Sequence, residues 1–255
     1  MKKLFLACAM LLASHQSAFA DDALKAALSG SQRTAANVTR DAARHPYETL
    51  SFFGIKSNMT VLELSPGGGW YTEILAPYLR PKGQLMVAGV GKGLQTRLDA
   101  EPTNFDKVTV VKFDTKGQTA LTNDNSVDMV LTFRNIHNWM GNGEPALKGV
   151  FQQVFNSLKP GGVFGVVEHR LPASMKQDEK ASSGYVHQAY VIQMAQSVGF
   201  KLVASSEVNA NPKDTANHEG GVWALPPVLG NKEKDKEKYM AIGESDRMTL
   251  KFVKP

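Results

Sequence analysis

Short apolar runs alternate with amphipathic stretches through most of the chain. Five of these runs have the length of a strand and are apolar almost throughout, with turn signals between them. A strand without a polar face is typical of a parallel sheet that helices cover on both sides. We therefore predict a doubly wound α/β fold. The predicted parallel strands are Thr60–Leu64, Gln84–Gly89, Val108–Phe113, Val127–Thr132 and Val163–Glu168.

The stretches between these runs have the periodicity of helices. A Lys-Pro-Gly-Gly sequence at 159–162 predicts a helix stop and a turn into the fifth strand. Ahead of the first strand, an Ala-rich segment broken at Gly30 and Ser31 predicts two short helices in an N-terminal extension, residues 21–46. A further helix is expected over Glu48–Phe53. The helices that alternate with the strands are predicted at Tyr71–Leu79, Lys92–Ala100, Pro145–Leu158 and Ser183–Val198.

The C-terminal part departs from simple alternation. Lys201–Val208 and Arg247–Val253 both read as strands, and a long polar segment separates them, residues 209–245, which we call the C-terminal excursion. A strand that returns after such a segment can close the sheet in the reversed direction. The prediction is a mostly parallel, seven-stranded Rossmann-like sheet in one domain, residues 21–255.

The first residues have the three zones of a secretory signal peptide. Lys2 and Lys3 precede an apolar run, Leu4–Ala13, and Ala18-Phe19-Ala20 forms a small-x-small cleavage site. Cleavage there would make Asp21 the first residue of the mature chain. The signal therefore predicts a periplasmic or secreted protein. The only cysteine, Cys8, lies within this segment, so the mature chain has no thiol for a disulfide or a zinc site.

Charge and hydropathy exclude two classes of partner. The formal net charge is +5, and the densest charge run, residues 232–238, alternates Lys with acids instead of forming a basic face. We expect no nucleic acid as partner. No segment after the signal peptide approaches the roughly 20 apolar residues of a membrane helix, so we expect no stable membrane span after cleavage. The sequence leaves the oligomeric state open.

A glycine-rich turn follows the first predicted strand and opens a helix. Gly67, Gly68 and Gly69 let the main chain approach a ligand, and free N–H groups at the start of the helix face it. As a dinucleotide fingerprint the turn lacks its third glycine, because Thr72 stands there, and Gly89 stands where the ribose-binding acid belongs. These two positions argue against a nicotinamide-dependent oxidoreductase, which remains a third hypothesis.

An acidic residue two positions before a G-x-G-x-G turn is the nucleoside-binding motif of class I methyltransferases, and residues 63–69 resemble it. Residues 126–131 and 158–162 are similar to the family's fourth strand and its turn into the fifth. More narrowly, the sequences at 67–77, 133–139 and 244–250 resemble a group of exported predicted bacterial methyltransferases.

The resemblance implies S-adenosylmethionine as the cofactor. Asp114 matches the position that bonds the adenine amine, while Ser65 replaces the usual first glycine and Gly89 the usual ribose-binding acid. We expect Ser65 to keep an ordinary backbone conformation, since a Cβ is unfavourable at positive φ. For Glu63 the alternative is a role as a cap at the end of the strand. The residues implied around the methionine part and the ribose are Glu63, Ser65, Gly67, Gly69 and Gly89.

Polar side chains also follow the fourth and fifth strands, where open α/β sheets bind ligands. Arg134 and Asn135 are predicted to form a wall for cofactor and substrate. His137 is a candidate to take a proton from the methyl acceptor, and Glu168 with His169 could act as base or orient the acceptor. The structural alternatives are that His137 fixes the loop and that Glu168 pairs with other charges at the rim of the sheet.

Two functional hypotheses follow. The leading one is an exported S-adenosylmethionine-dependent methyltransferase with a small-molecule acceptor and no metal. The other is a non-catalytic binding module on a degenerate methyltransferase fold, with Ser65 and Gly89 as traces of lost turnover. The three tryptophans, Trp70, Trp139 and Trp223, could shape an aromatic pocket or serve packing alone.

Overall fold

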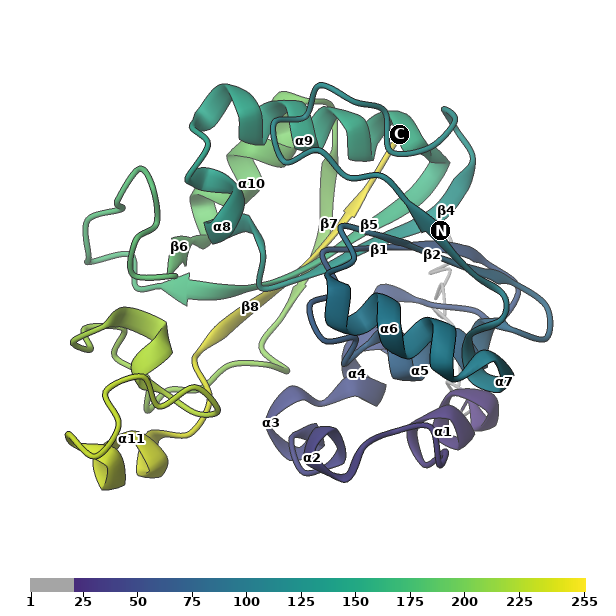
Figure 1. Cartoon of the computed structure of the whole chain (residues 1–255). Coiled ribbons are helices and arrows are strands. Elements are labelled where there is room, and N and C mark those ends of the chain that lie inside the picture. Colours follow the sequence, from purple (N-terminus) through teal and green to yellow (C-terminus); the bar gives the residue numbers. More distant parts are fainter. Residues whose placement is uncertain (1–20) are drawn as a thin grey trace, which may run out of the picture.

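A twisted sheet crosses the centre of the chain, and helices cover both of its faces (Figure 1). The computed structural model describes residues 21–255, so the predicted signal peptide lies outside the described residues. The strands of the main path run in the order β3-β2-β1-β4-β5-β8-β7, and a short strand, β6, pairs with β5. The strands are β1 Thr60–Leu64, β2 Gln84–Ala88, β3 Val108–Val111, β4 Val127–Phe133, β5 Leu158–Leu171, β6 Val186–His187, β7 Lys201–Ser206 and β8 Arg247–Val253.

This topology confirms the predicted fold class. β3, β2, β1, β4 and β5 pair in parallel, whereas β8 is antiparallel to both β5 and β7. The chain moves outward from β1 to β2 and β3, and then returns to place β4 on the other side of β1. The strand order therefore reverses between β1 and β4, and in open α/β sheets a crevice forms at the carboxyl ends of the strands at such a point.

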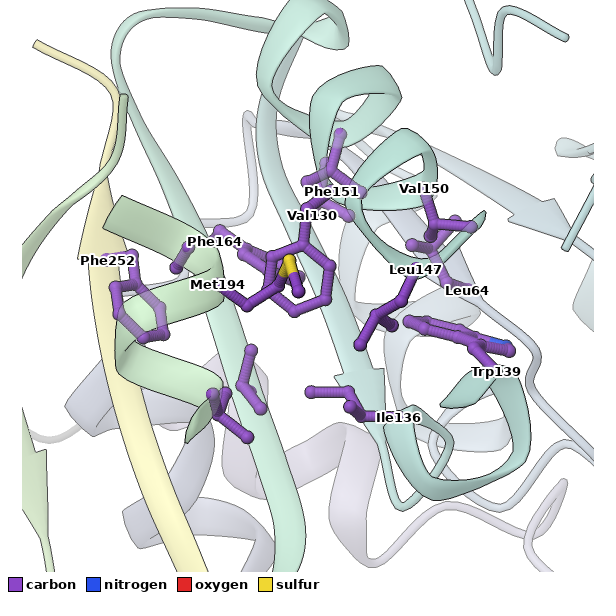
Figure 2. Close-up of a cluster of buried hydrophobic side chains, with 14 of the residues drawn as sticks. Leu64, Val130, Ile136, Trp139, Leu147, Val150, Phe151, Phe164, Met194 and Phe252 are labelled. Atoms are coloured by element: carbon purple, nitrogen blue, oxygen red, sulfur yellow. The ribbon is translucent and has the colours of Figure 1, made fainter. Parts of the chain in front are cut away.

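Two hydrophobic cores lie on opposite faces of the sheet. On the upper face in Figure 1, side chains of β4 and β5 such as Val130 and Phe164 meet Phe151 and Met194 from the helices, as Figure 2 shows. The neighbouring strand residues, among them Met129, point to the other face and pack beneath the helices drawn there. This alternation explains why the strands are apolar on both sides.

The helices divide between these faces. α8, α9 and α10 cover the first, and α1, α4, α5, α6 and α7 contribute to the second. The helices are α1 Asp22–Leu28, α2 Ala35–Val38, α3 Asp41–Arg44, α4 Pro46–Phe53, α5 Thr72–Leu79, α6 Lys92–Ala100, α7 Pro102–Phe105, α8 Ile136–Met140, α9 Glu144–Ser157, α10 Gln188–Ser197, the 3-10 helix η1 Gly221–Ala224 and α11 Lys236–Ile242.

Several predicted boundaries were wrong. β5 starts at Leu158 instead of Val163, because the Lys-Pro-Gly-Gly sequence forms an irregular part of the strand, with a register shift against β4, instead of a separate turn. α10 starts at Gln188 instead of Ser183, because the two residues before it pair with the end of β5. The N-terminal extension holds three short helices ahead of α4 instead of two.

The C-terminal excursion is tied to the sheet through one buried carboxylate. Asp214 accepts hydrogen bonds from the Tyr185 hydroxyl at 3.0 Å and from the backbone N–H of Asp246 at 2.8 Å. It also accepts from the backbone N–H of Ala216 at 2.9 Å and lies 2.8 Å from His218 Nε2. Arg170 adds a second tie, because it pairs with Asp246 and with Glu207 at the two ends of the excursion. The excursion, which contains η1 and α11, is therefore held against the end of the sheet.

None of the helices within residues 21–255 combines the length and the apolar character that crossing a bilayer requires.

Replacing Asp214 by alanine should loosen the excursion. The Tyr185 hydroxyl and the His218 imidazole would lose their buried acceptor, so we expect the free energy of unfolding to fall by about 3 kcal/mol. Limited proteolysis should then cut within residues 209–245, and urea denaturation measures the stability. Glu233→Ala is the control, because Glu233 forms only an exposed pair with Lys236. Equal stability of both variants would show that the excursion is held elsewhere.

Candidate active site

The glycine-rich turn leaves bare main chain open to a cavity. Gly67 and Gly69 have positive φ angles of 58° and 84°, which explains two of the glycines. A Cβ built on Gly67 or on Gly68 would meet no other atom within 4 Å. Within residues 21–255, the N–H groups of Gly67 and Gly68 donate to no protein acceptor. The turn therefore offers free donors and room for a ligand to approach the backbone.

Ser65, at the start of this turn, does not have the ordinary backbone conformation that we expected. Its φ is 50°, in the left-handed region, where a residue with a Cβ is less stable by roughly 1–2 kcal/mol. Its N–H donates to Ala88 O at 2.8 Å, which joins the turn to the end of β2. The turn thus requires this conformation, and it explains why the family has glycine here.

Gly89 has a structural reason to be glycine. Its φ is 76°, and an added Cβ would lie 2.9 Å from Phe113 Cδ1. A carboxylate side chain at this position would require the backbone and Phe113 to move. The local backbone conformation and the nearness of Phe113 therefore explain why glycine stands here instead of the family's acid.

Glu63 lies beneath the turn, in β1, and is almost fully buried. Thr72 Oγ1, at the start of α5, donates to Glu63 Oε2 at 2.7 Å. Burial raises the pKa of Glu63 to about 7, against the opposing effect of this hydrogen bond. Glu63 thus joins β1 to α5 and carries a carboxyl group that titrates near neutral pH.

A cavity of about 370 Å³ opens at the carboxyl ends of β1, β4 and β5. The glycine-rich turn forms one wall, α2 and α3 of the N-terminal extension form another, and the C-terminal excursion closes a third. Its size is in the range of small-molecule sites. The residues around it are Asn37, Arg40, Arg44, Ser65, Pro66, Gly67, Gly68, Trp70, Phe133, Arg134, Asn135, His137, Asn138, His169, Val222, Trp223, Pro226, Pro227, Val228, Glu244 and Ser245.

Asn135 holds the turn in place from the neighbouring strand. Its side-chain NH₂ lies 3.1 Å from Leu64 O, 3.2 Å from Ser65 O and 3.1 Å from Thr132 Oγ1. These contacts occupy its donors within the protein, so Asn135 connects the end of β4 to the turn. Its carbonyl oxygen is the part left for a ligand.

A cluster of three residues joins the ends of β4 and β5. The fully buried carboxylate of Glu168 accepts hydrogen bonds from His137 Nδ1 at 3.0 Å and from the backbone N–H groups of Ile136 and His169 at 2.5 and 2.8 Å. His169 Nδ1 lies 2.6 Å from Ser245 Oγ. Burial, followed by the charge of His137, lowers the pKa of His169 well below its usual value, so its ring is neutral at pH 7. The structure brings together the three residues that we predicted as catalytic.

The same three residues have atoms within 4.8 Å of one another, a spacing that could suit a metal ion. Both oxygens of Glu168 already accept hydrogen bonds from N–H groups, and one of these donors is His137 itself. A metal ion would have to displace the imidazole donor. The arrangement therefore favours a hydrogen-bonded carboxylate–imidazole pair.

Four arginines gather at the side of the cavity, around one carboxylate. Arg40 Nε, Arg44 Nε and Arg247 Nη1 lie 2.7, 3.3 and 3.0 Å from the oxygens of Glu244. Although burial acts to raise it, these guanidinium groups hold the pKa of Glu244 at about 2. Arg134 is the fourth member, and its guanidinium makes no hydrogen bond within the described part of the chain.

The tryptophans have different places. Trp70 is in contact with Arg33 and Arg44, whose guanidinium carbons lie 5.1 and 4.7 Å from its ring centre. Trp223, from η1, is 39% exposed and lies edge-on to His137 at 6.0 Å between ring centres. Trp139 is buried in the core on the far side of β4. Trp70 and Trp223 therefore border the cavity, and Trp139 serves packing.

The predicted site residues fall into two groups. Ser65, Gly67, Arg134, Asn135, His137 and His169 border the cavity, with Glu168 directly behind His137. The other four, Glu63, Gly69, Gly89 and Asp114, do not border the cavity: Glu63 is buried beneath the turn, and Gly69 is the residue of the turn that leads into α5. The Asp114 carboxylate accepts hydrogen bonds from the backbone N–H groups of Lys116 and Gln118, at 2.9 and 3.0 Å, which caps its own loop. A contact of Asp114 with adenine remains a prediction.

Part of the site comes from outside the strand ends and was not among the predicted residues. Arg40, Arg44 and Glu244 lie in the N-terminal extension and in the excursion, about 200 residues apart. Arg40 and Arg44 are one helical turn apart, and Glu244 lies in one of the segments that carry the family resemblance, but neither signal indicates that these residues meet.

Comparison with known proteins agrees with this architecture. A family model described as a methyltransferase domain matches residues 55–242. The chain belongs to this methyltransferase family. It is a class I S-adenosylmethionine-dependent methyltransferase. No curated protein sequence matches this methyltransferase significantly.

Solved structures share the fold of this methyltransferase at low identity. A SAM-dependent methyltransferase from Aquifex aeolicus is 16% identical, with a TM-score of 0.58, over 85% of this chain and 93% of that one. The glycopeptide N-methyltransferase MtfA is 16% identical, with a TM-score of 0.54, over 87% and 100%. A Burkholderia thailandensis 1,6-didemethyltoxoflavin-N1-methyltransferase, with bound 1,6-didemethyltoxoflavin and S-adenosylhomocysteine, is 13% identical, with a TM-score of 0.55, over 85% and 80%.

The residues of this site fit S-adenosylmethionine. Gly67 and Gly68 present open space and free N–H donors, which suit the carboxylate or hydroxyl oxygens of the ligand. The Asn135 side-chain oxygen, which has no partner within residues 21–255, borders the same cavity and suits the cationic end of the ligand. The methyltransferase therefore has a built cradle at the end of β1.

The raised pKa of Glu63 should make stability depend on pH. Because the folded protein holds this proton more tightly than the unfolded chain, wild-type stability falls as the pH rises from about 4.5 through 7. Glu63→Gln removes this titration, so it should be more stable than wild type at pH 8 by up to about 3 kcal/mol, and less different at pH 5. Urea denaturation at both values measures the difference. The same difference at both values would contradict a raised pKa.

A side chain on the turn should block the cofactor. Gly68 has an ordinary φ and open space around its Cα, so Gly68→Val should fold normally while its side chain fills the approach to the main chain. We expect affinity for S-adenosylhomocysteine to fall at least about 100-fold by calorimetric titration, as lost hydrogen bonds and a steric clash predict. Gly93→Val, in α6 and equally open, is the matched control. Unchanged affinity for Gly68→Val would place the cofactor elsewhere.

Proposed function

We propose that this methyltransferase is exported and transfers the methyl group to an oxygen or nitrogen atom of a small molecule. The observation that carries the proposal is the pair formed by His137 and Glu168. It borders the same cavity as the glycine-rich turn. A proton acceptor and the cradle for the cofactor thus share one small space.

The hydrogen bond between these residues sets the tautomer of His137. Glu168 accepts from Nδ1–H, and therefore Nε2 carries the lone pair. Two backbone N–H groups hold the carboxylate rigidly, so the ring keeps its orientation. Nε2 can accept a proton from the O–H or N–H group of the acceptor, and Glu168 then stabilises the imidazolium that results.

S-adenosylmethionine, when bound, supplies a methyl group on a positively charged sulfur. An oxygen or nitrogen lone pair of the acceptor would take this methyl group, and the bonding electrons would stay with the sulfur. His137 Nε2 takes the proton that the acceptor loses, so the methylated product leaves without a positive charge. The walls of the cavity hold the reacting groups in line, the largest contribution that a protein makes to such a transfer.

The shape of the cavity supports a small acceptor. Its volume of about 370 Å³ is closed by the N-terminal extension on one side and by Val222, Trp223 and Val228 of the excursion on another. The apolar and aromatic side chains of the excursion suit a flat or apolar part of the acceptor. Among the structural neighbours, the Burkholderia thailandensis protein has the small molecule 1,6-didemethyltoxoflavin bound.

Export is supported by the N-terminal sequence, with its Lys2-Lys3 start, apolar run and Ala18-Phe19-Ala20 site. Asp21, which cleavage would leave first, is the N-cap of α1, since its side chain accepts from Leu24 N at 3.0 Å. Its own N–H donates to the Tyr47 hydroxyl at 3.0 Å. N-terminal sequencing of the protein from a periplasmic fraction tests this part, and an uncleaved cytoplasmic chain would contradict it.

Replacing the base should slow transfer without releasing the cofactor. His137→Gln removes the imidazole that takes the proton, so we expect methyl transfer to fall about 100-fold or more, with S-adenosylmethionine affinity within about two-fold. Transfer from radiolabelled S-adenosylmethionine to a small-molecule extract of the periplasm measures the rate, and calorimetric titration measures the affinity.

His187→Gln is the matched control, since that ring lies outside the cavity and contacts Pro172 O. Equal losses of rate and affinity in His137→Gln would show that His137 only maintains the loop. Binding of S-adenosylhomocysteine with no transfer by wild type to any fraction would favour the non-catalytic binding module, and tight binding of NAD alone would overturn the family's cofactor.

A further inference from the structure

The cavity has an excess of positive charge on one side. Arg40, Arg44, Arg134 and Arg247 come from the N-terminal extension, the end of β4 and the start of β8. Three of them, Arg40, Arg44 and Arg247, contact the carboxylate of Glu244, whereas Arg134 contacts no carboxylate within the described residues. We call these four residues the arginine cluster. Four guanidinium groups around a single carboxylate leave most of their charge without a partner among residues 21–255.

Unused donors point to the same conclusion. Arg40 Nη2, Arg44 Nη1 and Arg247 Nε are buried and have no hydrogen-bond partner within the described residues. Buried polar groups without partners are rare in folded proteins, and each one needs an explanation. Arg40 and Arg44 border the cavity, so a ligand there can reach this side of the cluster.

Arg134 is the member best placed to meet a ligand. Its side chain borders the cavity and, within residues 21–255, it makes neither an ion pair nor a hydrogen bond. Burial, followed by repulsion from Arg247, lowers the pKa of Arg134 to about 10. Burial and repulsion from Arg134 lower the pKa of Arg44 to about 9. An anion at this place would relieve the repulsion between them.

The cluster lies on the side of the cavity where the acceptor reacts. Ser245, next to Glu244, contacts His169, and the positive charges of Arg134, Arg247 and Arg44 all act on the His169 ring. His169 in turn lies 5.3 Å from His137 between ring centres. An anion on the cluster would therefore stand beside the base and within reach of a molecule bound in front of it.

We propose that the arginine cluster binds an oxyanion group, a carboxylate or a phosphate, of the methyl acceptor. This inference deepens the proposed function and rests on it. The acceptor is then an anionic small molecule with a hydroxyl or amino group a short distance from its charged group. Guanidinium groups suit such oxyanions because their paired N–H donors match two oxygens at once.

The cofactor's own carboxylate is the other source of the same chemistry, and a competition experiment separates the two. Protein saturated with S-adenosylhomocysteine, which carries that carboxylate, is titrated with inorganic phosphate. If the cluster serves the acceptor, phosphate binds to the saturated protein. Phosphate that binds only without S-adenosylhomocysteine, and competes with it, would assign the cluster to the cofactor and overturn the proposal.

Substitution of Arg134 tests the site itself. Arg134→Gln should weaken phosphate binding about 10-fold and change S-adenosylhomocysteine affinity by less than about two-fold, because this side chain makes no bond that the fold needs. Arg134→Lys keeps the positive charge, so its phosphate affinity should fall less than that of Arg134→Gln. Arg80→Gln is the control for net charge, as Arg80 pairs with Asp106 on an exposed surface away from the cavity.

The remaining outcomes are also decisive. No phosphate binding, or binding that Arg134→Gln leaves unchanged, would show that the cluster only holds Glu244 and the N-terminal extension together. If phosphate binds but S-adenosylhomocysteine does not, the proposed function fails while the anion site stands. If S-adenosylhomocysteine binds and phosphate does not, only the anion site fails.

Discussion

The buried carboxylate of Glu168 holds the functional end of the sheet together. Backbone hydrogen bonds join parallel strands along their length. Beyond the last residue of each strand, these bonds no longer fix the direction of the backbone. Glu168 accepts hydrogen bonds from backbone N–H groups of both β5 and the first turn of α8. These bonds fix the position of the segment after β4 relative to the end of β5. The His137 ring is oriented by the same carboxylate. Position and chemistry of the site therefore depend on one side chain, which is why it is fully buried and fully hydrogen-bonded.

The neighbouring glycine-rich turn is held by a different means. Ser65 has a left-handed backbone conformation. Hydrogen bonds from Asn135 and to the end of β2 hold the turn on two sides. Strained backbone of this kind persists only where the surroundings over-determine it. The strain keeps Gly67 and Gly68 facing the cavity, where their donors remain free for a ligand.

Local patterns were enough to predict the fold and the part of the candidate site that lies at the strand ends. The apolar runs identified β1, β2 and β4 to within a residue or two, and the rule that ligands bind at strand ends located His137 and Glu168. Boundaries failed where pairing with a distant strand decided them, as at Leu158 in β5. The arginine cluster could not be predicted, because its members meet only after the N-terminal extension and the excursion fold over the same strand ends. The family resemblance predicted Glu63, and the rule on strand ends predicted Asn135, as ligand-binding residues, but neither could show that these side chains bond to other parts of the protein.

Glu244 connects the excursion to the N-terminal extension. Its carboxylate belongs to the excursion, whereas Arg40 and Arg44 belong to the N-terminal extension, so this ion pair joins two walls of the cavity that are about 200 residues apart in the sequence. The low pKa of Glu244 keeps the carboxylate ionised at neutral pH, so a single charged group ties the beginning of the described chain to its last strand.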